Sequence, residues 1–97
     1  MYIMVKVGIN GFGRIGRCFF KLAQRYKDEI QIVGINDIGT PKQMAHLLKY
    51  DSMYGVMKNK VTYDDANIYV DGEPFPLFQE RDVKCVDWNG LGAEIVI

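Results

Sequence analysis

The sequence is poor in the residues that build disulfide frameworks and metal centres. Its 97 residues include one histidine, His46, and two cysteines, Cys18 and Cys85, which stand 67 positions apart. These numbers exclude a disulfide-stapled scaffold and any recognisable zinc-ligand spacing. Unpaired cysteines without an export signal are typical of the reducing cytosol. We therefore expect a cytoplasmic protein without a metal site.

Excess charge and long apolar runs are also lacking. The 12 basic and 12 acidic side chains give a net charge of zero, whereas nucleic-acid binding needs an excess of Lys and Arg. No apolar run approaches the roughly 20 residues of a membrane helix, and the first residues do not have the form of a signal peptide. We expect neither a nucleic acid nor a membrane as a partner. The length allows one domain.

The first half of the sequence shows strand and helix patterns in alternation. Short runs rich in β-branched residues at 2–10 and 30–36 predict two buried strands. Between them, apolar residues at helical spacing predict a helix that buries Ile15, Phe19, Leu22, Ala23 and Tyr26. A capping box of Thr40 and Gln43 around Pro41 predicts a second helix to about Tyr50. That helix should bury Met44, Leu47 and Leu48.

The second half of the sequence predicts an antiparallel excursion from this βαβ unit. Short strands at 61–63 and 68–70 flank a turn at 64–67, and Asp71-Gly72 is a second turn before a strand at 75–79. A short helical segment at 87–92 leads into a final strand at 93–97. We predict an α/β fold, the first half of a doubly wound parallel sheet with an antiparallel hairpin insertion. The parallel order should be third, second, first, fourth strand, with the chain cut inside the fourth.

A glycine-rich turn carries the chemistry. Gly11, Gly13 and Gly16 form a GxGxxG between the first strand and the first helix, and Asp37 ends the second strand. Gly11 would permit the tight turn, Gly13 the approach of a pyrophosphate, and Gly16 close packing of helix on strand. Asp37 would accept hydrogen bonds from the ribose hydroxyls and repel a 2′-phosphate. This pattern predicts a Rossmann-type site that prefers NAD to NADP.

Several segments together resemble the opening of phosphorylating glyceraldehyde-3-phosphate dehydrogenases. The resemblance covers nearly the whole chain, and its segments are 6–17, 35–37, 45–52, 79–82, Trp88 and 92–94. It implies pyrophosphate contacts through the backbone of Arg14 and Ile15, a ribose carboxylate at Asp37, and an adenine contact at Arg81. The other cofactor-binding residues that we predict are Asn10, Gly11, Phe12, Gly13, Gly16 and Asn36.

The same resemblance implies a longer parent enzyme, in which residues 1–97 form part of the NAD-binding domain and the catalytic domain lies outside this chain. The parent would be a glycolytic homotetramer that oxidises glyceraldehyde 3-phosphate with NAD and inorganic phosphate. Neither Cys18 nor Cys85 matches its nucleophile, so we expect no catalytic residue here and no activity of this piece alone. We expect His46 to be a packing or surface residue and Arg17 to have a surface or subunit-contact role.

Two alternatives remain open at this point. Erythrose-4-phosphate dehydrogenases have a similar opening third, and the residues that distinguish them surround the nucleophile. A non-catalytic nucleotide-binding module is the other alternative. The apolar run Ile95-Val96-Ile97 argues against it, because an evolved chain end is usually polar and covered.

Overall fold

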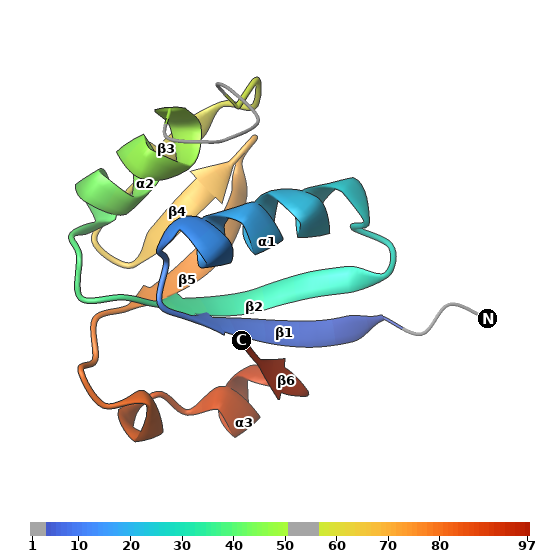
Figure 1. Ribbon diagram of the computed structural model, residues 1–97, viewed down its shortest axis with the longest axis vertical. Helices are drawn as coiled ribbons and strands as arrows, with labels where there is room; N and C mark the ends of the chain where they lie inside the picture. The colour runs from blue at the N-terminus through green and yellow to red at the C-terminus, as the bar shows by residue number, and fades with distance from the viewer. Residues whose placement is uncertain (1–3, 51–56) are drawn as a thin grey trace.

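A computed structural model describes residues 4–50 and 57–97 (Figure 1). The predicted strand residues before Met4 and the segment 51–56 lie outside the described residues. The elements, in chain order, are β1 Val5–Asn10, α1 Arg14–Arg25, β2 Ile30–Asn36, α2 Pro41–Tyr50, β3 Val61–Tyr63, β4 Asn67–Val70, β5 Glu73–Phe78, the 3-10 turn Val83–Cys85, α3 Trp88–Leu91 and β6 Ile95–Val96.

The described strands form one sheet in the order β3-β4-β5-β2-β1-β6. β2, β1 and β6 run parallel, and β5 joins them through Leu77 and Phe78, which pair with the end of β2. The start of β5 pairs antiparallel with β4, which pairs antiparallel with β3. The predicted parallel order and the antiparallel insertion are both confirmed. One strand, β5, belongs to both parts, so the hairpin extends the parallel sheet instead of lying apart from it.

Local sequence signals account for the boundaries. In the capping box of α2, the Thr40 N–H donates to Gln43 Oε1 at 3.0 Å, and the Gln43 N–H donates to Thr40 Oγ1 at 3.1 Å. Asp71 and Gly72 both have positive φ, 52° and 84°, which is the backbone that a two-residue hairpin turn requires. The predicted helix start and hairpin turn are thus confirmed.

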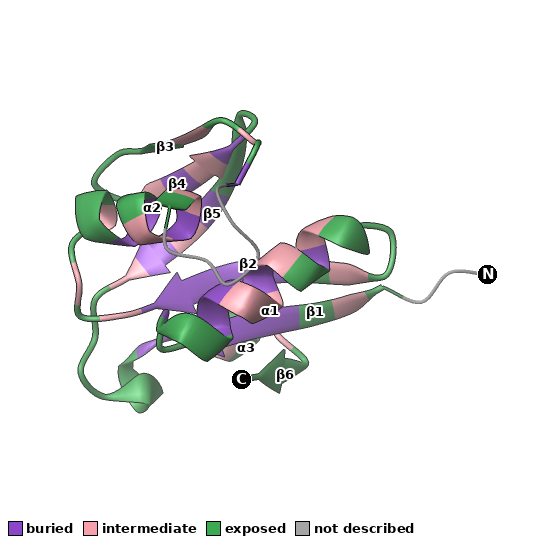
Figure 2. Cartoon of the chain, turned by 45° about the horizontal axis from the view of Figure 1, so that its top comes forward, coloured by how far each residue is buried: buried purple, intermediate pink, exposed green. Residues whose placement is uncertain are grey.

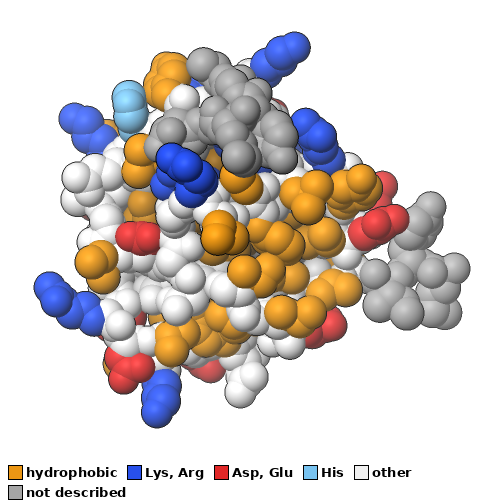
Figure 3. Space-filling view, in the orientation of Figure 1, with side chains coloured by type: hydrophobic (Ala, Val, Ile, Leu, Met, Phe, Trp, Pro, Cys, Tyr) orange, Lys and Arg blue, Asp and Glu red, His pale blue; other side chains and the backbone are white. Residues whose placement is uncertain are grey.

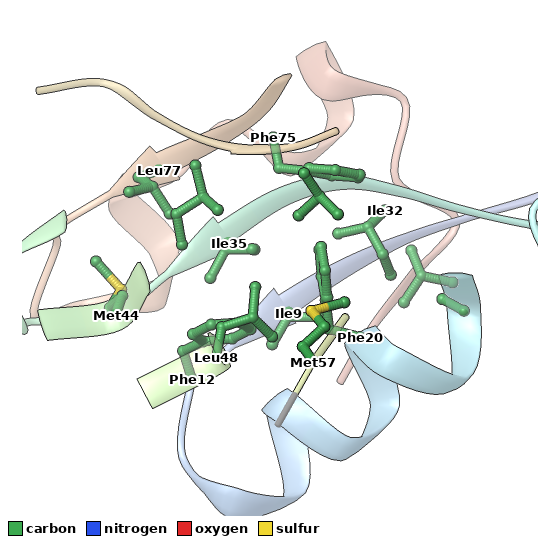
Figure 4. Close-up of a cluster of buried hydrophobic side chains, with 14 residues drawn as sticks. Ile9, Phe12, Phe20, Ile32, Ile35, Met44, Leu48, Met57, Phe75 and Leu77 are labelled. Atoms are coloured by element: carbon green, nitrogen blue, oxygen red, sulfur yellow. The ribbon is translucent and has the colours of Figure 1, made fainter. Parts of the chain in front are cut away.

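The main core lies between the sheet and the two longer helices. Buried side chains of both strands and helices point toward one another there (Figure 4), among them Ile9, Phe20, Ile35, Leu48 and Phe75. The Phe20 ring meets Phe75 edge-to-face, with 4.8 Å between ring centroids. Figure 2 shows the same buried positions along β1, β2 and the inner side of α1.

The predicted apolar stripe of α1 is wrong in its rotation. The helix buries Gly16, Arg17, Phe20 and Ala23, whereas Ile15, Leu22 and Tyr26 are exposed and Phe19 is half-buried. The physical reason is Gly16, whose missing side chain lets the helix touch the backbone of the preceding turn. Residues four and seven positions later must then face the sheet.

Trp88 covers the opposite face of the sheet. Gly8 and Gly34 are paired across β1 and β2, and an added Cβ at Gly8 would lie 2.4 Å from the indole ring. Since Ile9 faces α1, Gly8 faces the other way. The two glycines therefore form a flat platform for Trp88, which is half-buried.

Candidate functional site

The glycine-rich turn links the end of β1 to α1. Gly11 has a φ of 93°, which strongly favours glycine, and its N–H donates to the Asn36 carbonyl at 2.7 Å. A Cβ on Gly16 would lie 2.3 Å from the Gly11 carbonyl oxygen. Glycine is therefore favoured at position 11 by the backbone conformation of the turn and at position 16 by the close approach of the helix, which are the structural roles that the sequence predicted for them.

Gly13 stands at the start of α1, and its surroundings differ from those of Gly16. A Cβ built on it meets nothing within 4 Å, so the space in front of the helix start is open. All residues of α1 are described, and its first turn has no acidic side chain. The N–H groups at a helix start carry partial positive charge and have no partner within the helix. This end of α1 therefore suits an anion such as a pyrophosphate.

Asp37 lies beside this turn although 25 positions separate it from Phe12. Its Oδ2 accepts the Phe12 N–H at 2.6 Å, and its Oδ1 accepts the Gly39 N–H at 2.9 Å. Each carboxylate oxygen has a second lone pair, so the half-buried side chain can accept further hydrogen bonds. The structure brings together the carboxylate and the turn, which is the geometry that a ribose next to a pyrophosphate requires.

Asn36 has a structural task in this arrangement. Its side chain is buried, and its Nδ2 donates to Asn10 Oδ1 at 3.0 Å and to the Glu80 carbonyl at 2.9 Å. Its Oδ1 accepts the Glu80 N–H at 2.9 Å. The amide thereby joins the ends of β1 and β2 to the segment after β5, and it holds the backbone next to Arg81 at the same edge.

The remaining predicted residues differ in accessibility. Arg14, Ile15 and Arg81 are exposed, Ile15 to 79%, whereas the Phe12 ring is buried against Phe20. Phe12 can therefore act on a ligand only through its backbone, and its N–H already contacts Asp37.

The predicted surface role of Arg17 is wrong. Arg17 is only 7% exposed, and its Nη1 donates to the Phe12 carbonyl at 2.9 Å. The signal in the sequence is its place one helical turn after Gly13, where a long donor side chain can reach back to the carbonyls of the turn.

The remaining cysteines and the histidine form no metal-type cluster in the described part of the chain. Cys18 is half-buried and Cys85 exposed, and His46 is exposed and packs on Tyr50 with 5.0 Å between ring centroids. Across residues 4–50 and 57–97, no three His, Cys, Asp or Glu side chains gather as metal ligands would. Nor does any helix in those ranges have the length and apolarity to cross a bilayer.

The parallel strand order, the glycine turn and the carboxylate after β2 define the class of this domain, which is a Rossmann-type nucleotide-binding fold. The chain belongs to the family described as glyceraldehyde 3-phosphate dehydrogenase, NAD binding domain, whose model matches residues 5–97. NAD is thus the cofactor that the family implies, and the open space at Gly13 and the carboxylate at Asp37 fit it.

Curated relatives agree with this family. The chain is 50% identical over 93 residues to the glyceraldehyde-3-phosphate dehydrogenase of Borreliella burgdorferi, covering 96% of this chain and 27% of the relative. The Haemophilus influenzae enzyme of the same name is 43% identical, with the same coverage. The Thermotoga maritima enzyme is 42% identical over 95 residues, 97% of this chain and 28% of the relative. The chain therefore spans little more than a quarter of these relatives.

Proposed function

We propose that this chain holds the adenosine and pyrophosphate part of NAD at the carboxyl edge of β1 and β2. The N–H groups at the start of α1, from Gly13 through Ile15, would donate to the pyrophosphate. The Asp37 carboxylate would accept the ribose hydroxyls, and Arg81 would lie beside the adenine. The observation that carries the proposal is the 2.6 Å hydrogen bond from the turn to Asp37, which joins the two halves of the site.

The other predicted residues would shape this site without contacting the ligand through their side chains. Gly11 and Gly16 allow the turn and the helix to meet, and the Asn36 amide holds Asn10 and Glu80 at the same edge. The Phe12 ring anchors the turn in the core. NAD, when bound, supplies an acceptor for hydride, and this chain would bind and orient its adenosine end.

We further propose that residues 1–97 are part of the NAD-binding domain of a glyceraldehyde-3-phosphate dehydrogenase. The parent would oxidise and phosphorylate glyceraldehyde 3-phosphate in glycolysis, as a cytoplasmic homotetramer, with its catalytic residues in a domain outside this chain. The three relatives above are all named for that activity, which favours it over erythrose-4-phosphate oxidation and over a non-catalytic module. The piece alone would then be inactive. A nucleic-acid partner is not part of the proposal, because the net charge of zero leaves no excess of Lys and Arg for phosphate contacts.

Parallel titrations with NAD, ADP-ribose and NADP test the binding proposal. The folded chain should bind NAD and ADP-ribose with similar affinity and NADP more weakly, because Asp37 repels the 2′-phosphate. Asp37→Asn should weaken the binding of NAD by about tenfold, since hydrogen bonds to charged groups contribute about 1.5–3 kcal/mol. It should also reduce the difference in affinity between NAD and NADP. The matched control is Asp65→Asn, which makes the same substitution at an exposed aspartate in the β3–β4 turn. Unchanged selectivity in Asp37→Asn would remove Asp37 from this role.

A further inference from the structure

Arg17 holds two successive carbonyl groups of the glycine-rich turn. Its side-chain Nη1 donates to the Phe12 carbonyl at 2.9 Å, and its backbone N–H donates to the Gly13 carbonyl, also at 2.9 Å. Burying a guanidinium carries a large desolvation cost. A buried arginine bound to the backbone of a loop that carries the proposed ligand site therefore calls for an explanation beyond helix stability.

Because the peptide bond is planar, fixing a carbonyl group also fixes the direction of the N–H group that follows it. In a trans peptide, the C=O and the following N–H point in opposite directions. A Phe12 carbonyl fixed toward the guanidinium therefore turns the Gly13 N–H away from it. In the same way, the Gly13 carbonyl, held by the Arg17 backbone, turns the Arg14 N–H outward. These N–H groups stand at the open start of α1, where a Cβ on Gly13 would meet nothing within 4 Å.

The geometry points to Arg17 as a positioning residue for pyrophosphate binding: its guanidinium fixes the peptide plane that aims the Gly13 N–H at the phosphates. The inference rests on the proposed dinucleotide function. Without the guanidinium, the Phe12–Gly13 peptide can rotate more freely, because Gly13 has no side chain to restrict its own φ. The donor would then have to be ordered when the ligand binds, which lowers affinity.

The test compares a ligand that has the pyrophosphate with one that lacks it. ADP-ribose and adenosine are titrated into the 97-residue chain, and binding is followed by backbone amide NMR shifts. Arg17→Met keeps the apolar part of the side chain. It should weaken the binding of ADP-ribose about tenfold and change the affinity for adenosine less than about twofold. Arg17→Lys keeps the charge and one donor group but not the planar fork, and should weaken ADP-ribose about threefold. Arg25→Met, in the exposed last turn of α1, should bind both ligands as the wild type does.

Equal loss for both ligands, or no loss for ADP-ribose, would overturn the inference, because a residue that only stabilises the fold does not discriminate between them. Should Arg17→Met fail to fold, Arg17→Lys carries the same comparison. If the folded wild-type chain binds neither ligand, the proposed function fails and this role of Arg17 fails with it. If the wild type binds ADP-ribose and the variants lose affinity for ADP-ribose and adenosine equally, only the role of Arg17 fails.

Discussion

At the scale of single residues, Gly13 and Gly16 belong to one glycine motif but occur there for different reasons. A Cβ at Gly16 would collide with the Gly11 backbone, whereas a Cβ at Gly13 would stand in open space. Gly16 is therefore needed for the packing of the helix on the turn, whereas we expect Gly13 to leave room for a ligand. Stability and binding should respond separately when each glycine is replaced.

We predict that Gly16→Ala lowers the free energy of unfolding by about 1–3 kcal/mol, as overpacking against a fixed backbone does. Gly13→Ala should lose no more than about 1 kcal/mol, because Ala is only a poorer N-cap than Gly. The added methyl at position 13 should nevertheless weaken ADP-ribose binding, since it fills the space before the helix start. Urea unfolding and calorimetric titration of both variants measure the two effects. Equal stability losses, or normal ADP-ribose binding by Gly13→Ala, would contradict this division.

The sequence was informative about residues whose role is set by a local pattern. The spacing of the glycines and the place of Asp37 after a strand follow from neighbours in the chain, and both predictions of geometry agree with the structure. The roles of Arg17 and Asn36 are harder to predict from the sequence, because they depend on which groups the tertiary fold brings near these side chains. Neither the Phe12 carbonyl nor Glu80 can be recognised as a partner from the sequence pattern alone.

At the scale of elements, the rotation of α1 shows the same limit. Periodicity gives a helix and its apolar residues, but α1 has such residues on two sides, and only one side contacts the sheet. Figure 3 shows apolar side chains gathered on the face where α1 lies in Figure 1, which agrees with the exposure of Leu22 and Tyr26. The close approach at Gly16 decides the rotation, and it depends on turn geometry that hydrophobic spacing does not contain.

The packing of α3 gives a second prediction. Gly8→Ala would place a methyl group in steric overlap with the Trp88 indole. We therefore expect the free energy of unfolding to fall by about 1–3 kcal/mol. The fluorescence emission of the single tryptophan should also change. Truncating the ring removes the obstacle. Gly8→Ala should therefore cost much less in a Trp88→Ala background, and denaturant unfolding of the double-mutant cycle measures the difference. Equal costs in both backgrounds would show that the platform is not tight.

The β3–β4 hairpin gives a prediction about pH. The Tyr69 hydroxyl donates to Asp64 Oδ2 at 2.5 Å, and this bond, followed by the Ala66 N–H, holds the pKa of Asp64 below its ordinary value of 3.8. The same bond raises the pKa of Tyr69 above 10.0. Because the folded pKa of Asp64 is the lower one, its contribution to stability is present above 3.8 and is lost as the pH falls through the folded value.

Tyr69→Phe should therefore raise the pKa of Asp64 toward 3.8, because the largest cause of its depression is removed. A carbon-13 NMR titration of the carboxyl group measures this directly. Tyr63→Phe, at an exposed position on β3, is the control and should leave that titration unchanged. An Asp64 that titrates at its wild-type pH in Tyr69→Phe would show that the phenol does not set its pKa.

At the scale of the whole molecule, the strand order follows from few rules. A βαβ unit with a right-handed crossover places β2 beside β1, and a hairpin insertion returns β5 to the far side of β2. The remaining side of β1 receives β6. This made the topology predictable from the order of elements, although the rotation of one helix was not. It also leaves β6, in the described part of the chain, as the last strand on its side of the sheet.

The exposed β6 edge leads to a prediction about association. Ile95, Val96 and Ile97 are between 41% and 53% exposed, and an apolar edge strand with unpaired backbone groups is a template for pairing with another copy. We expect the isolated chain to associate as its concentration rises, and Val96→Lys to reduce this association, because a charged edge residue opposes strand pairing. Val83→Lys replaces an exposed valine away from the sheet and should leave the association unchanged. Sedimentation velocity over a range of concentrations measures the effect. If Val83→Lys and Val96→Lys reduced association equally, the cause would be net charge instead of the strand edge.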